Sequence, residues 1–135
     1  MIPPDLQIPG HRIRIGCDVV SLSEIEYSLS TFGARFLAKI YTAGELADCE
    51  GPSRLARLAA RFAAKEAAMK AFARPDAAFV PLEIEVASAD HLPTLRLTGA
   101  AAQLAEHQGW RQISVSLTHA ECHAAAVVVA ACDKS

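Results

Sequence analysis

The chain has 135 residues, of which 52% are hydrophobic and 21% are charged, and its formal net charge is −2. This length fits one domain. The apolar content excludes a globally disordered chain, and the charge balance makes a nucleic acid a poor default partner. The first ten residues contain three prolines and no basic segment followed by an apolar one, and no apolar run is long enough to span a bilayer. We therefore expect a cytoplasmic protein that does not bind a membrane.

Hydrophobic periodicity predicts an alternation of strands and helices. Residues 12–22 alternate as a strand, with Cys17 on its apolar face as an expected buried thiol and Asp18 on its other face. The other predicted elements are helices at residues 24–37, 42–49, 54–73 and 99–107, and strands at residues 82–86, 94–98, 113–118 and 124–131. Thr42 and Glu45 have the spacing of a capping box that opens the second of these helices. This order predicts an α+β domain of mainly antiparallel sheet packed with a long central helix. We assign residues 1–11 to an N-terminal extension and residues 12–135 to the domain.

Two positions place charge where a core is expected, and such breaks in pattern occur at functional sites. Asp18 lies in an apolar strand beside Gly16, which lets a ligand or a second backbone approach closely. Asp18 could equally cap the helix that follows. On the long helix, Glu66 projects into the apolar stripe and Lys70 lies one turn further on. These two residues either form an i,i+4 ion pair or hold a cation and a phosphate.

Basic residues follow a second face of the same helix: Arg54, Arg57, Arg61 and Lys65. Such a stripe is commonly a solvated face, although guanidinium groups also match phosphate oxygens in bidentate geometry. Among the histidines only His119, at the end of a predicted strand, is placed for a site, and a structural role is the more common one for a lone histidine.

Three segments in order resemble the motifs of the holo-acyl-carrier-protein synthases, which are small 4'-phosphopantetheinyl transferases. They are residues 15–20 (IGCDVV), 61–71 (RFAAKEAAMKA) and 114–119 (SVSLTH). The resemblance spans about residues 13–130, and the central segment is its most specific part. It implies the single-domain 4'-phosphopantetheinyl transferase fold and the transfer of the phosphopantetheine arm of coenzyme A to a serine of an acyl carrier protein, with release of 3',5'-ADP.

The resemblance also implies a role for each unusual residue. Asp18 and Glu66 would bind Mg²⁺, a cation that takes hard oxygen ligands; the residues alone do not distinguish Mg²⁺ from Mn²⁺, because both accept oxygen ligands in octahedral geometry. Lys70 would neutralise the attacked phosphate, which makes Asp18, Glu66 and Lys70 the catalytic set. The residues expected at coenzyme A are Arg61, Lys65, Lys70, Ser116 and His119. The serine proton would pass either to Glu66 or to a water held by the metal.

Similarity to the short members of this family implies a homotrimer with active sites at subunit junctions. The family often carries an arginine, six residues beyond the aspartate, that meets the acidic carrier protein, but here that position is Glu24. A carboxylate would repel an acidic carrier, so we expect either docking through other basic residues, such as Arg35 and Lys39, or an unusually neutral carrier, such as one dedicated to polyketide or secondary metabolism. The sequence leaves open whether fatty acid or secondary metabolism is served. Two alternatives remain: a nucleotide or coenzyme A binding module without transfer activity, and a Mg²⁺-dependent nucleotide diphosphate hydrolase.

Overall fold

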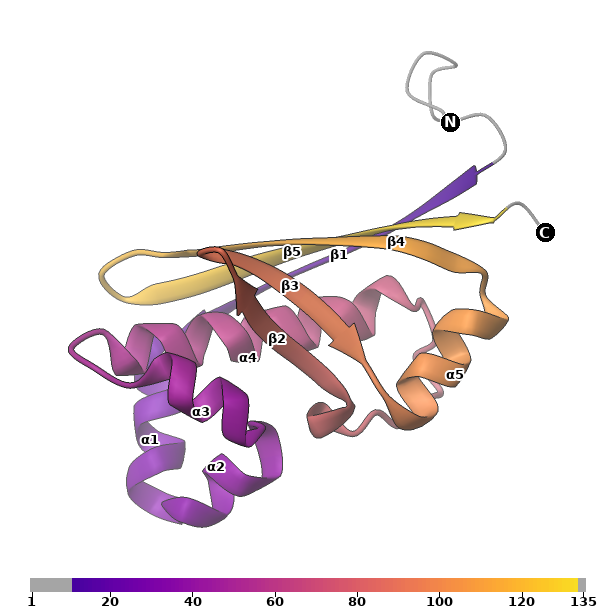
Figure 1. The fold of residues 1–135 in the computed structure, drawn as a ribbon. Helices are drawn as coiled ribbons and strands as arrows, with labels where there is room; N and C mark the ends of the chain where they lie inside the picture. Colours follow the sequence, from indigo (N-terminus) through magenta and orange to yellow (C-terminus); the bar gives the residue numbers. More distant parts are fainter. Residues whose placement is uncertain (1–10, 134–135) are drawn as a thin grey trace.

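The computed structural model describes residues 11–133, within which five strands and five α-helices form one domain (Figure 1). The strands are β1 (His11–Ser21), β2 (Ile84–Ala89), β3 (Leu92–Leu97), β4 (Trp110–His119) and β5 (His123–Asp133). The helices are α1 (Leu22–Phe32), α2 (Ala34–Ile40), α3 (Ala43–Cys49), α4 (Arg54–Ala71) and α5 (Gly99–His107), and a 3₁₀ turn spans Pro81–Glu83. The predicted extension lies outside the described residues apart from His11, at which β1 begins.

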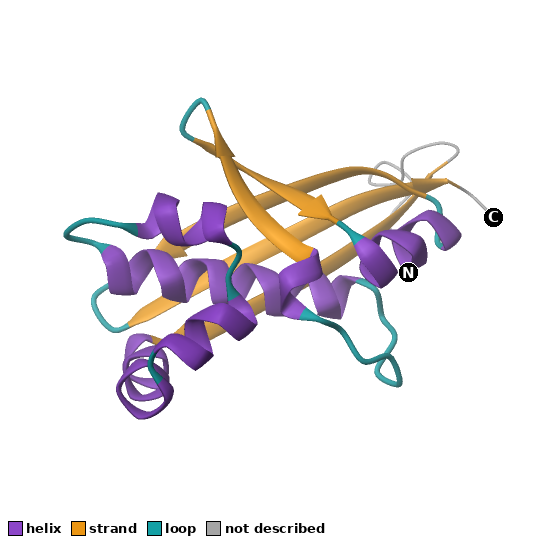
Figure 2. Cartoon of the chain, turned by 60° about the horizontal axis from the view of Figure 1, so that its bottom comes forward, coloured by secondary structure: helices purple, strands orange, loops and turns teal. Residues whose placement is uncertain are grey.

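The sheet is antiparallel throughout, as predicted. β5 lies between β1 and β4, and β2 and β3 form a separate hairpin. The long helix α4 packs against β1 and β5, with α1, α3 and the β2–β3 hairpin on its other sides (Figure 2). The central helix of the prediction is therefore confirmed. Among the described residues no helix is both long and apolar enough to cross a membrane.

Gly33 divides the helix predicted over residues 24–37 into α1 and α2. Its φ of 56° is in the left-handed region, and its N–H bonds to the carbonyl of Leu29, which closes α1. Thr42 begins α3 with the expected capping box, in which Thr42 Oγ1 accepts from the Glu45 N–H and the Glu45 carboxylate accepts from the Thr42 N–H.

Alanine makes the contact between α4 and the sheet unusually close. Seven of the ten buried residues of α4 are alanines: Ala59, Ala60, Ala63, Ala64, Ala67, Ala68 and Ala71. On the facing strand, a Cβ built at Gly16 would overlap the carbonyl oxygen of Ala67 and lie 2.8 Å from the nitrogen of Ala71. Only glycine fits there, because any side chain would push β1 away from α4.

The two faces of β1 are as the alternation predicted, but the face with Cys17 lies outward. Asp18 and Gly16 face α4, whereas Ile15 and Val19 are 65% and 64% exposed. In Figure 1 every described helix lies on one side of the β1–β5–β4 sheet. The expectation of a buried Cys17 thiol is therefore wrong for the single chain, where Cys17 is exposed.

Candidate active site

Asp18 and Lys70 meet at the seam between β1 and α4. Lys70 Nζ lies 3.0 Å from Asp18 Oδ1 and donates a second hydrogen bond of 3.2 Å to the Cys17 carbonyl. The Asp18 side chain is 18% exposed and that of Lys70 is 58% exposed. The hydrogen bond from Lys70 to Asp18 raises the pKa of Lys70, so the lysine is held as a cation at the edge of the seam.

Glu66 lies one turn before Lys70 on α4 and is half-buried. Burial raises the pKa of Glu66, the Asp18 carboxylate raises it further, and Lys70 acts in the opposite direction. The influence of Asp18 means that the two carboxylates are close enough to repel each other. The structure therefore brings Asp18, Glu66 and Lys70 together from residues that are 48 and 52 positions apart in the sequence. The alternative of a simple ion pair between Glu66 and Lys70 is not found: Lys70 pairs with Asp18.

These side chains suit a magnesium ion. The Asp18 carboxylate raises the pKa of Glu66, so a divalent cation between the two would relieve their repulsion, and their oxygens are the hard donors that Mg²⁺ prefers. No cluster of three or more His, Cys, Asp or Glu that could hold a metal occurs in residues 11–133. A two-carboxylate donor set fits Mg²⁺, because this ion keeps several waters and takes further oxygens from substrate phosphates.

Arg61 belongs to a second site, on the side of α4 that faces the β2–β3 hairpin. Its Nη2 donates to Ser88 Oγ at 3.2 Å and lies 3.8 Å from Asp48 Oδ2, while its buried Nε has no partner. An unpaired buried donor is costly. A cavity of about 400 Å³ lies beside Arg61, and its other lining residues are Asp48, Arg57, Ser88, His91, Pro93 and Leu117. The cavity thus offers two guanidinium groups to an anion.

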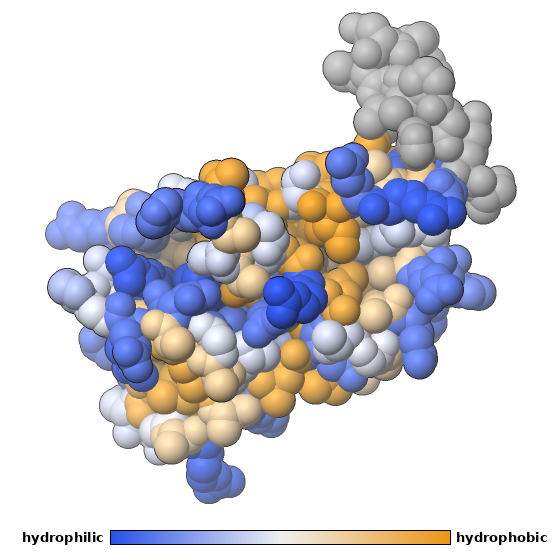
Figure 3. Space-filling view, viewed as in Figure 1, coloured by the Kyte–Doolittle hydropathy of each residue, from blue (hydrophilic) through white to orange (hydrophobic). Residues whose placement is uncertain are grey.

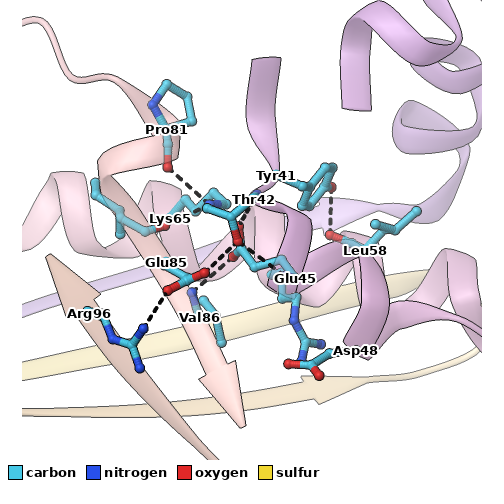
Figure 4. A network of polar contacts seen from close by, with 12 residues as sticks. Tyr41, Thr42, Glu45, Asp48, Leu58, Lys65, Pro81, Glu85, Val86 and Arg96 are labelled. Carbon is cyan, nitrogen blue, oxygen red and sulfur yellow. Dashed lines mark hydrogen bonds and ion pairs between the residues drawn. The ribbon is translucent and has the colours of Figure 1, made fainter. Parts of the chain in front are cut away.

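Lys65 lies in the interior, contrary to the expectation that it contacts coenzyme A. Its side chain is 1% exposed and that of Glu45 is 0% exposed, and Lys65 Nζ lies 2.8 Å from Glu45 Oε1. The ammonium also donates to the carbonyl of Pro81 at 3.0 Å (Figure 4) and to that of Ile84 at 2.6 Å. All three N–H donors of Lys65 are used inside the protein.

The Lys65–Glu45 pair belongs to a wider buried network. Glu45 Oε2 accepts from the Val86 N–H at 2.9 Å, and Thr42 Oγ1 donates to Glu85 Oε2 at 2.6 Å (Figure 4). Burial lowers the pKa of Lys65, and the Glu45 carboxylate partly offsets this. The predicted basic stripe is therefore not one solvated face: Arg61 and Lys65 are buried because α3 and β2 cover α4 on the side opposite the sheet.

Ser116 and His119 lie on β4, two strands away from Asp18. Asp18 is in register with Ala126, and Ala126 with Leu117, so Ser116 points to the outer face of the sheet. Both Ser116 and His119 are exposed. Within one chain the structure does not bring them to the Asp18 group.

Sequence reasoning missed Asp48, Ser88 and His91 as neighbours of Arg61. Ser88 is the next-to-last residue of β2, and His91 lies in the turn after that strand with a φ of 65°. Neither position carries a signal that links it to Arg61, which lies 27 residues before Ser88 and 30 before His91. Glu45 was seen only as a capping residue, although its carboxylate also neutralises Lys65.

Comparison with known proteins agrees with this arrangement. Residues 14–132 match the family model described as the 4'-phosphopantetheinyl transferase superfamily. The holo-[acyl-carrier-protein] synthase of Chloroflexus aggregans is 41% identical over 135 residues, which covers 89% of this chain and 96% of the relative. That of Solidesulfovibrio magneticus is 47% identical over 118 residues, covering 85% and 94%.

Solved structures of similar proteins share the fold. The Chronobacterium ammoniagenes ACPS–CoA complex has a TM-score of 0.79 at 28% identity and covers 92% of this chain and 99% of that one. The Helicobacter pylori holo-[acyl-carrier-protein] synthase in complex with coenzyme A has a TM-score of 0.72 at 28% identity, covering 86% and 98%. By fold, by sequence and by the extent of both matches, the chain belongs to the holo-[acyl-carrier-protein] synthases of the 4'-phosphopantetheinyl transferase superfamily.

Proposed function

We propose that this enzyme transfers 4'-phosphopantetheine from coenzyme A to a serine hydroxyl of an acyl carrier protein, with Mg²⁺ bound and with release of 3',5'-ADP. The observation that carries the proposal is the convergence of Asp18, Glu66 and Lys70 at the seam between β1 and α4. The names of the relatives and the coenzyme A complexes of two similar structures support it.

Each member of this group has a task in the transfer. Asp18 and Glu66 would hold Mg²⁺, which supplies positive charge to the diphosphate of coenzyme A when bound. Lys70 is exposed enough to leave Asp18 and donate to the oxygens of the attacked phosphate. Asp18 orients Lys70 before the substrate arrives, so that little rearrangement is needed as charge develops.

The reaction is a substitution at the β-phosphorus. The serine oxygen forms a bond to this phosphorus while the bond to the oxygen bridging the two phosphates breaks, and that electron pair leaves with 3',5'-ADP. The serine proton passes to Glu66 or to water. The products are a phosphodiester on the carrier serine and free 3',5'-ADP.

The nucleotide end of coenzyme A would bind at Arg61, whose unpaired buried Nε lies beside a cavity with a second guanidinium, that of Arg57. We assign Ser116 and His119 to the same ligand from a neighbouring subunit, because within one chain both lie on β4, two strands away from Asp18, and Ser116 points to the outer face of the sheet. Coenzyme A would then lie at a junction between two copies of the chain.

A homotrimer that buries the outer face of the sheet would form such junctions. The exposed large apolar residues of this face are Ile13, Ile15, Val19 and Val127. Figure 3 views this sheet nearly edge-on and shows apolar groups at the surface among charged ones on the adjoining side of the molecule. A contiguous exposed apolar face of a folded chain is characteristic of an interface. Light scattering coupled to size exclusion measures the assembly, and a monomeric mass would reject this part of the proposal.

The carrier protein would dock at the corner of α1 and α2. Glu24 is exposed and would repel an acidic partner, whereas Arg35 and Lys39 are exposed and form no ion pair within the described residues. Both cations border a groove of about 400 Å³ together with the exposed Phe32. We expect the double charge reversal Arg35→Glu, Lys39→Glu to raise KM for the carrier at least tenfold and leave KM for coenzyme A unchanged. We expect Glu24→Arg to lower KM for the carrier.

The decisive experiment is the intact mass of an apo carrier protein after incubation with this enzyme, coenzyme A and Mg²⁺. We expect a gain of one phosphopantetheine that a chelator abolishes and that Asp18→Ala and Glu66→Gln each reduce at least a hundredfold. Full Mg²⁺-dependent transfer by either variant would refute the metal assignment. Formation of 3',5'-ADP without a carrier would indicate the hydrolase, and bound coenzyme A with no product would indicate the binding module.

A further inference from the structure

The contact between α3 and α4 carries two pairs of opposite charges. Glu45 and Asp48 lie three residues apart on α3, and both side chains extend toward α4 (Figure 4). Their partners, Lys65 and Arg61, lie four residues apart on one side of α4. Lys65 Nζ lies 2.8 Å from Glu45 Oε1, and this pair is buried. The buried pair fixes how α3 lies along α4, so it also fixes the distance from Asp48 to Arg61.

The Asp48–Arg61 pair is incomplete. Asp48 Oδ2 lies 3.8 Å from Arg61 Nη2, too far to accept a hydrogen bond, and Nη2 donates to Ser88 Oγ instead. The buried Nε of Arg61 has no partner, although a carboxylate in bidentate geometry would satisfy it. The Asp48 side chain is 41% exposed and that of Arg61 is 7% exposed. Asp48 therefore lowers the positive potential around Arg61 while the guanidinium keeps a free donor.

We propose that Asp48 is a resident counter-charge of the Arg61 cavity, one that competes with phosphate for Arg61 and limits the affinity for coenzyme A and for 3',5'-ADP. The inference rests on the function proposed above, which places the nucleotide end of coenzyme A at Arg61. Asp48 lines the cavity of about 400 Å³ together with Arg61 and Arg57. A phosphate that enters this cavity would bind two guanidinium groups and be repelled by the carboxylate.

A counter-charge of this kind favours release of the product. Coenzyme A and 3',5'-ADP share their nucleotide end, so tight binding of this end would hold substrate and product alike. Interactions that are equal in the ground state and the transition state lower KM but do not raise kcat. Because Asp48 is half-exposed, its carboxylate can approach Arg61 as the phosphate leaves. Asp48 should therefore reduce product inhibition by 3',5'-ADP.

Replacing Asp48 by asparagine removes the charge and keeps the size of the side chain. If Asp48 competes with phosphate, Asp48→Asn tightens binding; if Asp48 instead orients Arg61 for the phosphate, Asp48→Asn weakens it. Glu50→Gln is the matched control, because Glu50 is an exposed acid two residues away that does not line the cavity. It also forms no ion pair within residues 11–133. Calorimetry on the full chain with Mg²⁺ measures the dissociation constants of coenzyme A and 3',5'-ADP.

We expect Asp48→Asn to lower both dissociation constants about three- to fivefold at low salt, which is the effect of one partly exposed charge, and less at high salt. The inhibition constant of 3',5'-ADP in the transfer assay should fall by the same factor. Glu50→Gln should change none of these constants by more than about twofold. An unchanged dissociation constant in Asp48→Asn would overturn the proposal, and a raised one would show that Asp48 orients Arg61.

Arg61→Gln separates a failure of this inference from a failure of the proposed function. If the nucleotide end lies at Arg61, this variant binds 3',5'-ADP more weakly, and Asp48→Asn added to it gives a smaller gain in affinity than in the parent. An equal gain in both backgrounds would overturn the competition for Arg61. Unchanged binding of 3',5'-ADP in Arg61→Gln would reject the proposed position of the nucleotide end, and this inference with it. These dissociation constants need no carrier, so they do not depend on transfer activity.

Discussion

Replacing Lys65 by methionine tests the buried network most directly. The substitution removes the ammonium and keeps an unbranched side chain in the space of the lysine stem. Glu45 then keeps its hydrogen bonds from the Thr42 and Val86 N–H groups, each of 2.9 Å, but loses its charge partner. The carbonyls of Pro81 and Ile84 lose their donor.

The expected loss of stability follows from these contacts. Removing one partner of a buried ion pair costs about 3–5 kcal/mol. The two backbone donors that remain on Glu45 place this variant near the lower end, at about 3 kcal/mol, or a decrease in Tm of roughly 10 °C for a domain of this size. Urea unfolding at pH 7 measures the free energy. Lys39→Met, an exposed lysine with no ion pair in the described residues, is the matched control and should change the free energy by no more than about 0.5 kcal/mol.

The pH dependence gives the same prediction a second readout. The pKa of Lys65 is lower in the folded chain than its ordinary value of 10.5, chiefly because of burial. In the pH window just below 10.5 the unfolded chain therefore binds more protons at this position, so folding stability rises with pH there. Lys65→Met should lack that rise. A variant as stable as the parent, with a raised KM for coenzyme A, would refute the reasoning and return Lys65 to the coenzyme A site.

Three further predictions concern the seam, the outer face and the loop after α4. Gly16→Ala is expected to lower the unfolding free energy by about 1–3 kcal/mol and to reduce transfer, because the new methyl group overlaps the Ala67 carbonyl. Gly44→Ala in α3 is the tolerated control, because the atom nearest to a Cβ built there is 3.4 Å away. Equal stability of the two variants would contradict the close packing of β1 on α4. Burial raises the pKa values of the Cys49 and Cys132 thiols, so a thiol reagent should modify them slowly. In a monomer the reagent should quickly modify the two exposed thiols, Cys17 and Cys122, whereas in the proposed trimer it should quickly modify Cys122 alone. The same extent of labelling in Cys17→Ser as in the parent would show that Cys17 is protected. The hydrogen bond from Arg74, with a smaller contribution from a backbone N–H, lowers the pKa of Asp76 to about 2. Arg74→Gln should raise this pKa toward its ordinary value in an NMR carboxyl titration, and an unchanged midpoint would contradict the bidentate pair of Arg74 with Asp76.

Local signals predicted the elements whose boundaries depend on a few neighbouring residues. The helix over residues 99–107 is as expected, and so is the capping box at Thr42. Both depend on residues at the helix boundary itself: Gly109 just after the first helix, and Thr42 with Glu45 at the start of the second. The break at Gly33 was missed, since the hydrophobic pattern continues across it and only the φ of 56° shows that the chain turns.

The candidate site was predictable where it depends on one helix and one strand. Asp18 on the inner face of β1 contacts Lys70 on α4, as the presence of a charged residue within each apolar pattern suggests. Lys65 could not be placed, because a helical projection assumes one buried face and α4 is buried on two. The positions of Ser116 and His119 relative to Asp18 depend on strand order, which places β5 between β4 and β1.

The alanine-lined seam makes the distance between two backbones part of the active site. Asp18 has a short side chain, and it reaches Lys70 only because Gly16 lets α4 lie directly on β1. Larger apolar residues in place of the buried alanines would increase the apolar area that α4 buries, and this effect alone would stabilise the fold. The same residues would move the helix that carries Glu66 and Lys70 away from the strand that carries Asp18. In this fold, stabilisation by core filling and retention of activity therefore oppose each other along the length of α4.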